Sequence, residues 1–584
     1  MKKYMKKTLS AAVIASLLLS FPYSAAWADD AGTAVVVDNR YPVVLSDALQ
    51  VKVTGMLSEH TLDGTRLAAT VKMYNVTGDT VRVPDYEVRA LAANGAKYTL
   101  RGSADNVVNV PPMSSIELIY YAQIDIGGEV APADLLWIDV NKDVYPKVET
   151  TMLDLPVANL VWHGDSSWVS DASAIKAWGE TFTIPSLDSP LTYTPVSLTT
   201  DYKSQNPVKV MKLLAENPGG KSEKIPNFSI NGRSASQVFK GTRADQTVTA
   251  LDPGEKKYIY YAIPTDLDTE LQSFTISTPH SFKIPNRTDA AAQISYSIGR
   301  LSVSMPTTSQ LQAQEATPPT SYTVETVVPI DPLNTAINPN ISVSVVDLQL
   351  YENKGMGYQT GLVKLRFKNR SDKPLPVPQF AAELVGGGFT YAGTRLNAAA
   401  TMVAPDTDYA LAYSFVLPLD GVKDAYTLRL VDDKTAAPYR STFGQVGLAV
   451  NKPRLDNAKL LMYPFEVSIK DWSLSNNVNL NQTTRQYEYM YRLKITFDLK
   501  SVDPVFVDSN YNKLLIELEN KVGRKVASTT VSLNGDNRMI NGEQLINFYD
   551  TGSDQLEYPL VLKLYETIDT PSGPARRLMA SMQQ

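Results

Sequence analysis

The feature that most constrains the fold is a segment that occurs three times along the chain. Its copies read VKMYNVTGDTVRVPDY at 71–86, KLLAENPGGKSEKIPNF at 212–228 and LRFKNRSDKPLPVPQF at 365–380. In each copy an Asn stands nine positions before a Pro, and a β-branched residue precedes that Pro. The asparagines, Asn75, Asn217 and Asn369, lie 142 and 152 residues apart. The chain is therefore expected to be built from copies of one module.

The residues around these asparagines predict a strand that runs into a turn. Val363, Leu365 and Phe367 alternate with lysine and arginine, which is the two-residue period of a half-buried strand. Turn-forming residues follow, and the Pro marks a sheet edge or a strand start because it cannot donate to a ladder. A fourth, divergent copy is predicted in FDLKSVDPVFVDSN at 497–510, with Leu499 at the position of Asn369.

A second signature lies downstream of each copy, where a turn containing Pro leads into a strand. The four letters IYYA occur in it twice, at 119–122 and at 259–262, and the third copy keeps Tyr413 without the doublet. Loss of the doublet favours repeat architecture over a fixed platform for a sugar ring. Adjacent strand residues point to opposite faces, so one tyrosine of each pair is predicted to face the core and the other the solvent.

Many short predicted strands, joined by Gly, Pro, Asn and Asp turns and without long helices, predict an all-β fold of four tandem β-sandwiches. This strand-and-turn pattern resembles the secreted immunoglobulin-like domains of Gram-positive bacterial proteins whose function is unassigned. The resemblance implies fold and location, and it supplies no catalytic residue. The predicted divisions are a signal peptide at 1–28, sandwiches at 29–160 and 161–305, a Pro/Thr/Gln-rich linker at 306–323, and sandwiches at 324–452 and 453–584 (divergent).

The N-terminal sequence predicts export. Four lysines precede an apolar run that ends at Ala26-Trp27-Ala28, which is the pattern of a cleaved secretory signal peptide. We expect a secreted, extracellular protein, either free or held at the cell surface without a covalent anchor. No second apolar run approaches the roughly 20 residues that a spanning helix needs.

Charge and cysteine content narrow the partners. Cleavage removes four lysines and no acidic residue, so the formal charge moves from −6 to −10. An acidic exported chain is a poor candidate for binding nucleic acid or anionic lipid. The chain has no cysteine, which excludes disulfides, thiol catalysis and cysteine-ligated zinc.

The search for catalytic motifs centres on three histidines, His60, His163 and His280. They lie about a hundred residues apart, in no H-E-x-x-H or H-x-H pattern, and are predicted to be surface or loop residues. The sequence also lacks a G-x-S-x-G elbow and the glycine patterns of nucleotide sites. We expect no enzymatic activity and no cofactor, while an enzyme with a composite site between domains remains an alternative.

One segment resembles the opening of a calcium loop. Asp139, Asn141 and Asp143 have the spacing of the first ligands, but Val144 and Thr150 replace the Gly and Glu that such a loop needs. A strand that ends in a turn is the favoured interpretation, and these three residues remain a weak calcium candidate.

Aromatic residues supply the candidates for ligand stacking. Trp162 and Trp168 bracket the polar segment HGDSS, and an indole there could stack on a sugar. Packing within strands is the favoured alternative, because tyrosine is common in strands in any case. The remaining stacking candidates are the two doublets, Tyr120, Tyr121, Tyr260 and Tyr261.

These observations predict a non-enzymatic scaffold, spacer or adhesion module. Its partners are expected to be protein or polysaccharide at the cell surface, docking on exposed edge strands or on a patch of loops. An array of carbohydrate-binding modules is the alternative. The oligomeric state is not predicted.

Overall fold

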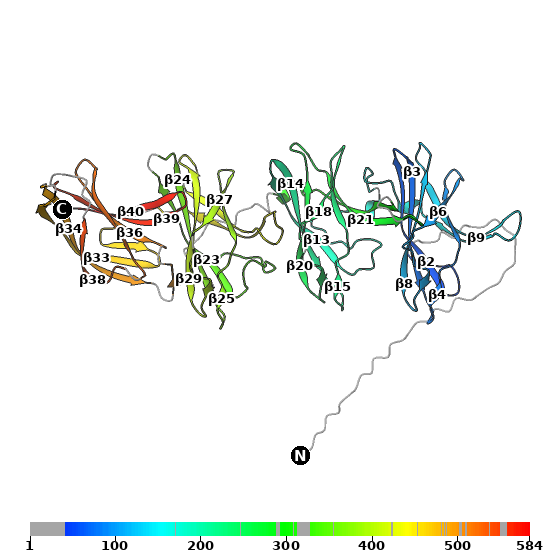
Figure 1. The fold of residues 1–584 in the computed structure, drawn as a ribbon, viewed down its shortest axis with the longest axis horizontal. Coiled ribbons are helices and arrows are strands. Elements are labelled where there is room, and N and C mark those ends of the chain that lie inside the picture. The colour runs from blue at the N-terminus through cyan, green and yellow to red at the C-terminus, as the bar shows by residue number, and fades with distance from the viewer. Residues whose placement is uncertain are drawn as a thin grey trace, which may run out of the picture.

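The computed structural model describes most of the chain from residue 41 onward. The described residues are 41–169, 171–245, 247–287, 292–307, 309–311, 327–353, 356–396, 398–421, 424–452, 454–480, 482–483, 485, 487–501, 505–508, 511–535, 538–548 and 557–584. The predicted signal peptide and residues 312–323 of the predicted linker lie outside them. The all-β prediction is confirmed, and the strands follow one another along a single long axis (Figure 1).

Among the described residues, the buried apolar side chains gather in four large clusters, each drawn from one stretch of chain. We name the stretches unit 1 (41–162), unit 2 (163–311), unit 3 (327–452) and unit 4 (454–584). The predicted boundaries of the four sandwiches stay predictions. Representative core residues are Val71 and Trp137 in unit 1, Met211 and Phe274 in unit 2, Phe367 and Leu428 in unit 3, and Ile495 and Leu564 in unit 4.

The main sheet of unit 1 folds over the core in the order β1-β2-β3-β8-β6-β5-β9-β10, with β11 paired to β2, and β4 and β7 form a separate two-stranded sheet. Its elements are β1 (Val43–Val44), β2 (Leu49–Thr61), β3 (Gly64–Asn75), β4 (Val81–Arg82), β5 (Glu87–Ala92), β6 (Lys97–Gly102), β7 (Asn109–Val110), β8 (Ser115–Ile124), β9 (Pro132–Asn141), β10 (Val148–Pro156), the 3₁₀ helix η1 (Ala158–Leu160) and β11 (Val161–Trp162).

Unit 2 has the sheets β13-β14-β20-β18 and β12-β22-β21-β16-β17, and a two-stranded sheet β15-β19. Its elements are η2 (Ala172–Ala174), β12 (Ile175–Lys176), β13 (Thr192–Lys203), β14 (Asn206–Glu216), β15 (Glu223–Lys224), β16 (Ser229–Arg233), β17 (Val238–Phe239), β18 (Thr242–Arg243), β19 (Ala250–Leu251), β20 (Lys256–Pro264), β21 (Ser273–Lys283) and β22 (Gln293–Ser304).

Unit 3 follows the order β23-β24-β29-β27-β26-β30-β31, and unit 4 has the sheets β32-β33-β34-β38 and β37-β36-β39-β40. Unit 3 contains β23 (Ile341–Glu352), β24 (Tyr358–Asn369), β25 (Leu375–Pro376), β26 (Ala381–Gly386), β27 (Phe389–Arg395), β28 (Met402–Val403), β29 (Asp408–Pro418), β30 (Ala425–Asp432) and β31 (Ser441–Ala449). Unit 4 contains β32 (Lys459–Met462), β33 (Phe465–Leu480), β34 (Tyr487–Ser501), β35 (Val505–Phe506), β36 (Lys513–Glu519), β37 (Lys525–Ser532), β38 (Gly542–Phe548), β39 (Val561–Thr570) and β40 (Gly573–Gln583).

Two long hairpins recur in every unit. The first hairpin is β2–β3, β13–β14, β23–β24 or β33–β34, and the last hairpin is β9–β10, β21–β22, β30–β31 or β39–β40. Each carries one β-bulge, and the bulged residues mark equivalent positions from unit to unit. They are Thr54, Val196, Val346 and Lys470 in the first hairpins, and Met152, Arg300, Phe443 and Met579 in the last hairpins.

The repeated Asn joins the two sequence signatures. The Asn217 side chain is fully buried, and its Nδ2 donates to the backbone oxygens of Lys221 at 2.8 Å and Leu251 at 2.9 Å. Its Oδ1 accepts from the Gly219 amide at 2.9 Å. One side chain therefore closes its own turn and holds the Pro turn that begins the second signature. Asn75 and Asn369 make the same set of bonds to Asp79, Val110 and Thr77, and to Lys373, Val403 and Ser371.

The register corrects the alignment of the two IYYA segments. Tyr120, Tyr261 and Tyr413 each lie opposite the residue six positions before the Asn of their unit. These three tyrosines are therefore equivalent, and Tyr121 takes the place of Ala262. The doublets lie on the same strand of their units but are offset by one residue.

The register also corrects the fourth copy. Ser501 faces Phe465 across β33–β34, five residues before the bulge, as Asn369 faces Ile341 in unit 3. Ser501, rather than Leu499, therefore occupies the Asn position. A shift of two residues keeps every side chain on its face, so strand alternation alone did not reveal it. Further along the chain, β35 pairs in parallel with β29 of unit 3.

Removing the buried amide should destabilise one unit selectively. Asn217→Ala strands the carbonyls of Lys221 and Leu251, and we expect unit 2 to lose about 2–4 kcal/mol of unfolding free energy. Urea unfolding followed by fluorescence, with Trp178 in the unit 2 core as reporter, measures the loss. Asn227→Ala, at an exposed position of the same segment, is the control. Equal midpoints for both variants would contradict the role assigned to Asn217.

Candidate functional site: the joints between units

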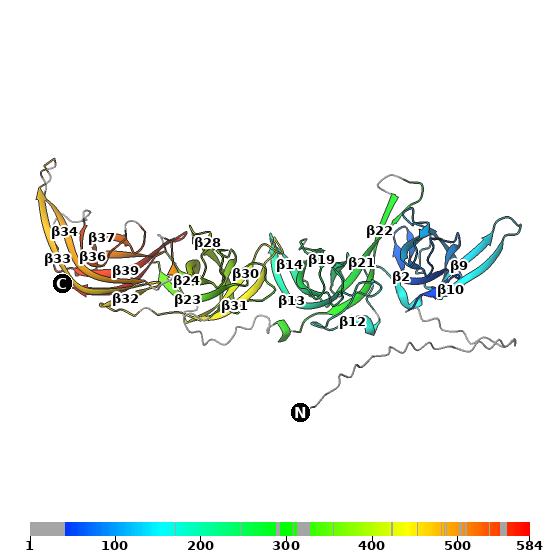
Figure 2. The same cartoon turned by 90° about the horizontal axis from the view of Figure 1, so that it is seen from below.

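The first hairpins of units 1 to 3 lie in sheets that are buried on both faces. The inner face packs on the core of its own unit, and the outer face packs against the last hairpin of the next unit (Figures 1 and 2). We call these contacts joints 1–2, 2–3 and 3–4. Their apolar clusters are Leu57, Ala68, Tyr121 and Trp162 against Phe282, Tyr296 and Ile298 in joint 1–2, Val208, Val210, Tyr260 and Ala262 against Ala436 in joint 2–3, and Tyr351, Leu362, Ala410 and Ala412 against Tyr511, Ile568 and Ala575 in joint 3–4.

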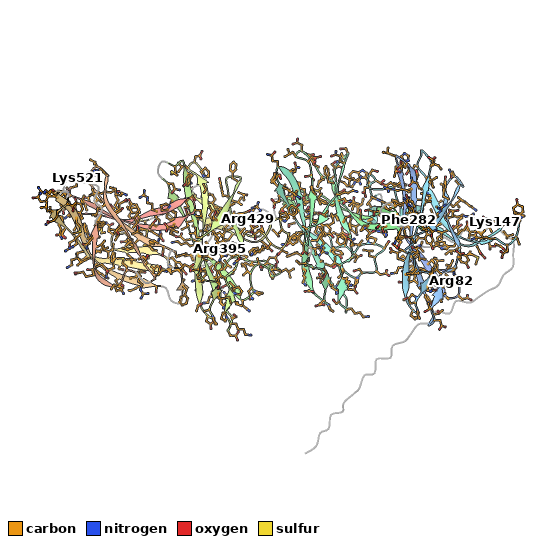
Figure 3. All side chains as sticks on the ribbon, in the orientation of Figure 1. Arg82, Lys147, Phe282, Arg395, Arg429 and Lys521 are labelled. Atoms are coloured by element: carbon orange, nitrogen blue, oxygen red, sulfur yellow. The ribbon has the colours of Figure 1, made fainter. Side chains whose placement is uncertain are left out.

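Each tyrosine doublet has one side chain in a core and one in a joint. Tyr120 packs on the core of unit 1 and Tyr261 on the core of unit 2, as the alternation predicted. The second tyrosine of each pair does not face the solvent. Tyr121 is 6% exposed and stacks on Phe282 with ring centroids 5.0 Å apart, while Tyr260 is buried in joint 2–3. Figure 3 shows Phe282 where unit 2 meets unit 1. Both doublets are thus packing elements shared by core and joint.

The two tryptophans differ in exposure. Trp162 is 6% exposed, and its ring lies so close to Gly299 that an added Cβ would come within 2.6 Å of it. Its indole therefore packs inside joint 1–2. Trp168 is 46% exposed and lies 4.4 Å from the guanidinium carbon of the buried Arg233.

Arg233 fixes the segment between the tryptophans. Its guanidinium donates to the backbone oxygens of Asp165 at 2.7 Å and Ser166 at 2.8 Å. Because Arg233 belongs to β16 of unit 2, these bonds hold the segment on that unit and set the position of the Trp168 ring. The result is a half-exposed indole with a fixed orientation.

Joint 3–4 contains a fully buried charged group. Lys364 of β24 lies 2.6 Å from Glu566 of β39, and Arg577 of β40 lies 2.7 Å from the other Glu566 oxygen. The side chains are 1%, 0% and 8% exposed respectively. Burial acts to raise the pKa of Glu566, but the two cations and the hydrogen bonds outweigh it, and the net pKa is lowered. Glu566 is therefore a carboxylate at neutral pH, shared between both units.

Joint 2–3 repeats part of this arrangement. Lys212 stands at the position equivalent to Lys364, lies 3.3 Å from Asp331 of unit 3, and sits 3.8 Å above the ring centroid of Tyr258. The Tyr258 hydroxyl donates to the same carboxylate at 2.8 Å. Burial lowers the pKa of Lys212, and Asp331 opposes that shift.

A cleft of about 660 Å³ opens beside Lys212 between units 2 and 3. Four carboxylates line the cleft. Asp331 is bonded as described, Asp432 accepts from the backbone amides of Lys434 and Thr435, and Glu255 pairs with Lys257 at 2.7 Å. The fourth, Asp252, is exposed.

Joint 1–2 contains His280, which lies 5.7 Å from the Tyr296 ring in a stacked arrangement. Its Nε2 is 3.1 Å from both Thr278 Oγ1 and an Arg300 nitrogen, and its Nδ1 is 3.8 Å from Glu117 of unit 1. Burial, and then the charge of Arg300, lower the pKa of His280 to about 4. The imidazole is therefore neutral at pH 7, with Nε2 as acceptor. Arg300 itself donates to the backbone oxygen of Thr54, which the bulge in β2 leaves free of the ladder.

The other histidines lie elsewhere. His60 Nδ1 is 3.5 Å from Thr65 Oγ1, and His163 Nδ1 is 2.9 Å from Glu129. Within the described part of the chain, no three His, Asp or Glu side chains are grouped so that they could hold a metal ion.

The calcium candidate is the end of the last hairpin of unit 1. Asp139 and Asn141 belong to β9, Asp143 follows in the turn, and its amide donates to Asn141 Oδ1 at 3.0 Å. All three are exposed. The hairpin β9–β10 projects from unit 1 (Figure 2), and Lys147 marks its tip in Figure 3. The turn bond accounts for the spacing of Asn141 and Asp143 without an ion.

Comparison with known proteins gives no match: no protein-family model and no curated protein matches the chain. The described residues form no helix with the length and apolar character needed to cross a membrane.

Joint 1–2 should weaken in mild acid. The ordinary pKa of histidine is 6.5 and that of buried His280 is about 4, so the unfolded chain binds the proton more readily. The neutral ring contributes at most about 3 kcal/mol to the unfolding free energy. This contribution is fully present above pH 6.5 and is lost as the pH falls from 6.5 to 4. Thermal unfolding between pH 7 and pH 4 measures this loss.

The comparison variant is His280→Gln, which should show a shallower pH dependence. Burial raises the pKa of Glu117, which acts in the opposite direction, but this residue is present in both proteins and cancels in the difference. His163→Gln, at a partly exposed histidine outside the contacts of His280, is the matched substitution. Identical profiles for the parent and His280→Gln would refute the assignment.

Proposed function

We propose that this chain is an exported, non-enzymatic scaffold that acts as a rigid spacer for protein or polysaccharide partners at the cell surface. The observation that carries the proposal is the double burial of the first-hairpin sheets. Contacts between domains of one chain usually permit relative motion unless they are large and apolar. Here each joint combines an apolar cluster with a contact made by a buried or half-buried charged side chain: Arg300 with the Thr54 carbonyl, Lys212 with Asp331, and Lys364 with Glu566.

The charged contacts supply a fixed orientation. Sliding unit 4 across unit 3 would separate Glu566 from Lys364 and leave a buried charge without its partner, which costs about 3–5 kcal/mol. The apolar cluster alone would tolerate small displacements. Joint 3–4 is further held by the pairing of β35 with β29 and by the bond from the Tyr409 hydroxyl to Asp508 at 2.5 Å.

Distances across the joints test the rigid-spacer function. The chain has no cysteine, so exposed residues can be replaced one pair at a time and spin-labelled. Suitable exposed sites are Thr99, Thr199, Thr390 and Ser528, one in each unit. We expect narrow distance distributions across all three joints. Broad distributions in the parent chain would overturn the proposal.

A matched pair of variants then tests the charge. Lys364→Ala should broaden the Thr390–Ser528 distribution and leave the Thr99–Thr199 distribution unchanged, because it removes the ion pair between Glu566 and unit 3, while Arg577 pairs with Glu566 from within unit 4. Lys368→Ala removes an exposed lysine four residues along the same strand and should change neither distribution.

Carbohydrate binding is the second candidate, and Trp168 is the observation that favours it. A half-exposed indole held over Arg233 loses little conformational entropy when a sugar stacks on it. In a pull-down, peptidoglycan or plant polysaccharide should then retain the parent chain. The Trp168→Ala variant should be retained at least tenfold less. Trp162→Phe, at the buried indole, is the control, and equal retention of both variants rejects Trp168 as the site.

A further inference from the structure

The three joints use the same positions on the outer face of the sheet. Two positions of each first-hairpin sheet face the next unit. One is on the second strand of the hairpin, seven residues before the repeated Asn. The other is on the strand paired with it, one residue before the core-facing tyrosine. All six side chains are aliphatic or aromatic and contribute to the joint clusters. They are Ala68, Val210 and Leu362 on the second strand, and Ile119, Tyr260 and Ala412 on the third.

The first-hairpin sheet of unit 4 differs at these positions. Lys494 lies seven residues before Ser501, so it occupies the position of Leu362 in unit 3. Glu543 pairs with the residue five positions before Ser501, so it occupies the position of Ala412. The two charged side chains are 49% and 52% exposed and pair with each other at 2.8 Å. At these two positions the sheet therefore presents a charged pair, while Leu545, which lies opposite Lys494 on the same face, is 61% exposed.

The opposite end of the array shows a similar substitution. In the last hairpins, Asp139 is equivalent to Glu566, and Asn141 to Ile568, by their distance from the bulge. On the partner strand, Val148 and Thr150 replace Ala575 and Arg577 in the same way. All four unit 1 side chains are exposed, and only Val148 is apolar.

We infer that these two end faces exclude a second copy of this chain and that their residues set the length of the rod. A hairpin docked on a sheet is a head-to-tail contact, which would propagate into an open filament if the ends were compatible. Docking the present ends would bury Asp139 without Arg577 beside it and would desolvate the Lys494–Glu543 pair. In other repeat arrays, terminal repeats with a polar outer face keep the protein soluble. The inference rests on the proposed spacer function and adds a fixed number of units to it.

Grafted ends provide the test. The sheet graft gives unit 4 the docking residues of unit 3, and the hairpin graft gives unit 1 those of unit 4. Sedimentation velocity and light scattering then report mass for each chain alone and for an equimolar mixture. The sheet graft is Ser475→Tyr, Lys494→Leu, Thr496→Lys and Glu543→Ala, and the hairpin graft is Asp139→Glu, Asn141→Ile, Val148→Ala and Thr150→Arg.

The parent and each grafted chain should sediment as monomers, and the mixture should double in mass. A chain with both grafts should form a concentration-dependent series of longer oligomers. If the full sheet graft fails to fold by circular dichroism, Lys494→Ala with Glu543→Ala replaces it. Self-association of the parent chain, or a monomeric mixture of folded grafted chains, overturns the inference. The mass of the assembly is measured independently of the distances within one chain. A failed mass prediction can therefore be told apart from a failure of the rigid-spacer function.

Discussion

The second strand of each first hairpin carries the packing on which the other parts of the structure depend. In β24, Leu365 and Phe367 face the core of unit 3, while Leu362 and Lys364 face unit 4. A strand alternates its side chains between two faces, so one strand can satisfy both requirements at once. Core formation and joint formation are therefore coupled through the same backbone. A register slip of one residue would exchange the two sets and disrupt both.

The repeated bulges lie next to the joints. In units 1 to 3 the first hairpin gains one residue beside the outer face that meets the next unit, and in units 2 to 4 the last hairpin gains one beside its docking residues. In unit 1 the bulge also frees the Thr54 carbonyl, which receives Arg300 of unit 2. An extra residue that weakens the ladder locally is thus used to accept a bond from the neighbouring unit.

Much of the fold could be predicted from the sequence, because strand alternation and turn residues act locally. The repeated Asn marked the turn and the second signature marked the next strand. The burial of the outer faces could not be predicted, since alternation separates two faces without saying what covers the second one. Tyr121 and Trp162 therefore looked accessible, and Lys364 looked like an ordinary surface lysine. One signal was present: Lys212 and Lys364 are separated by the same 152 residues as their asparagines.

The buried asparagines also bear on protein modification. Asn75-Val76-Thr77 and Asn369-Arg370-Ser371 match the acceptor pattern for N-linked glycans. In the folded chain, however, the Asn Oδ1 accepts from the hydroxyl two residues on, at 2.8 Å and 2.7 Å, and Nδ2 is committed to buried carbonyls. A sugar on that nitrogen would break the bonds that close the turn. The sequence matches the pattern because a hydroxyl at the third position suits an Asx turn as well as a glycan acceptor. In the folded protein these three residues form a closed backbone turn, and the Asn side chain does not offer a site for modification.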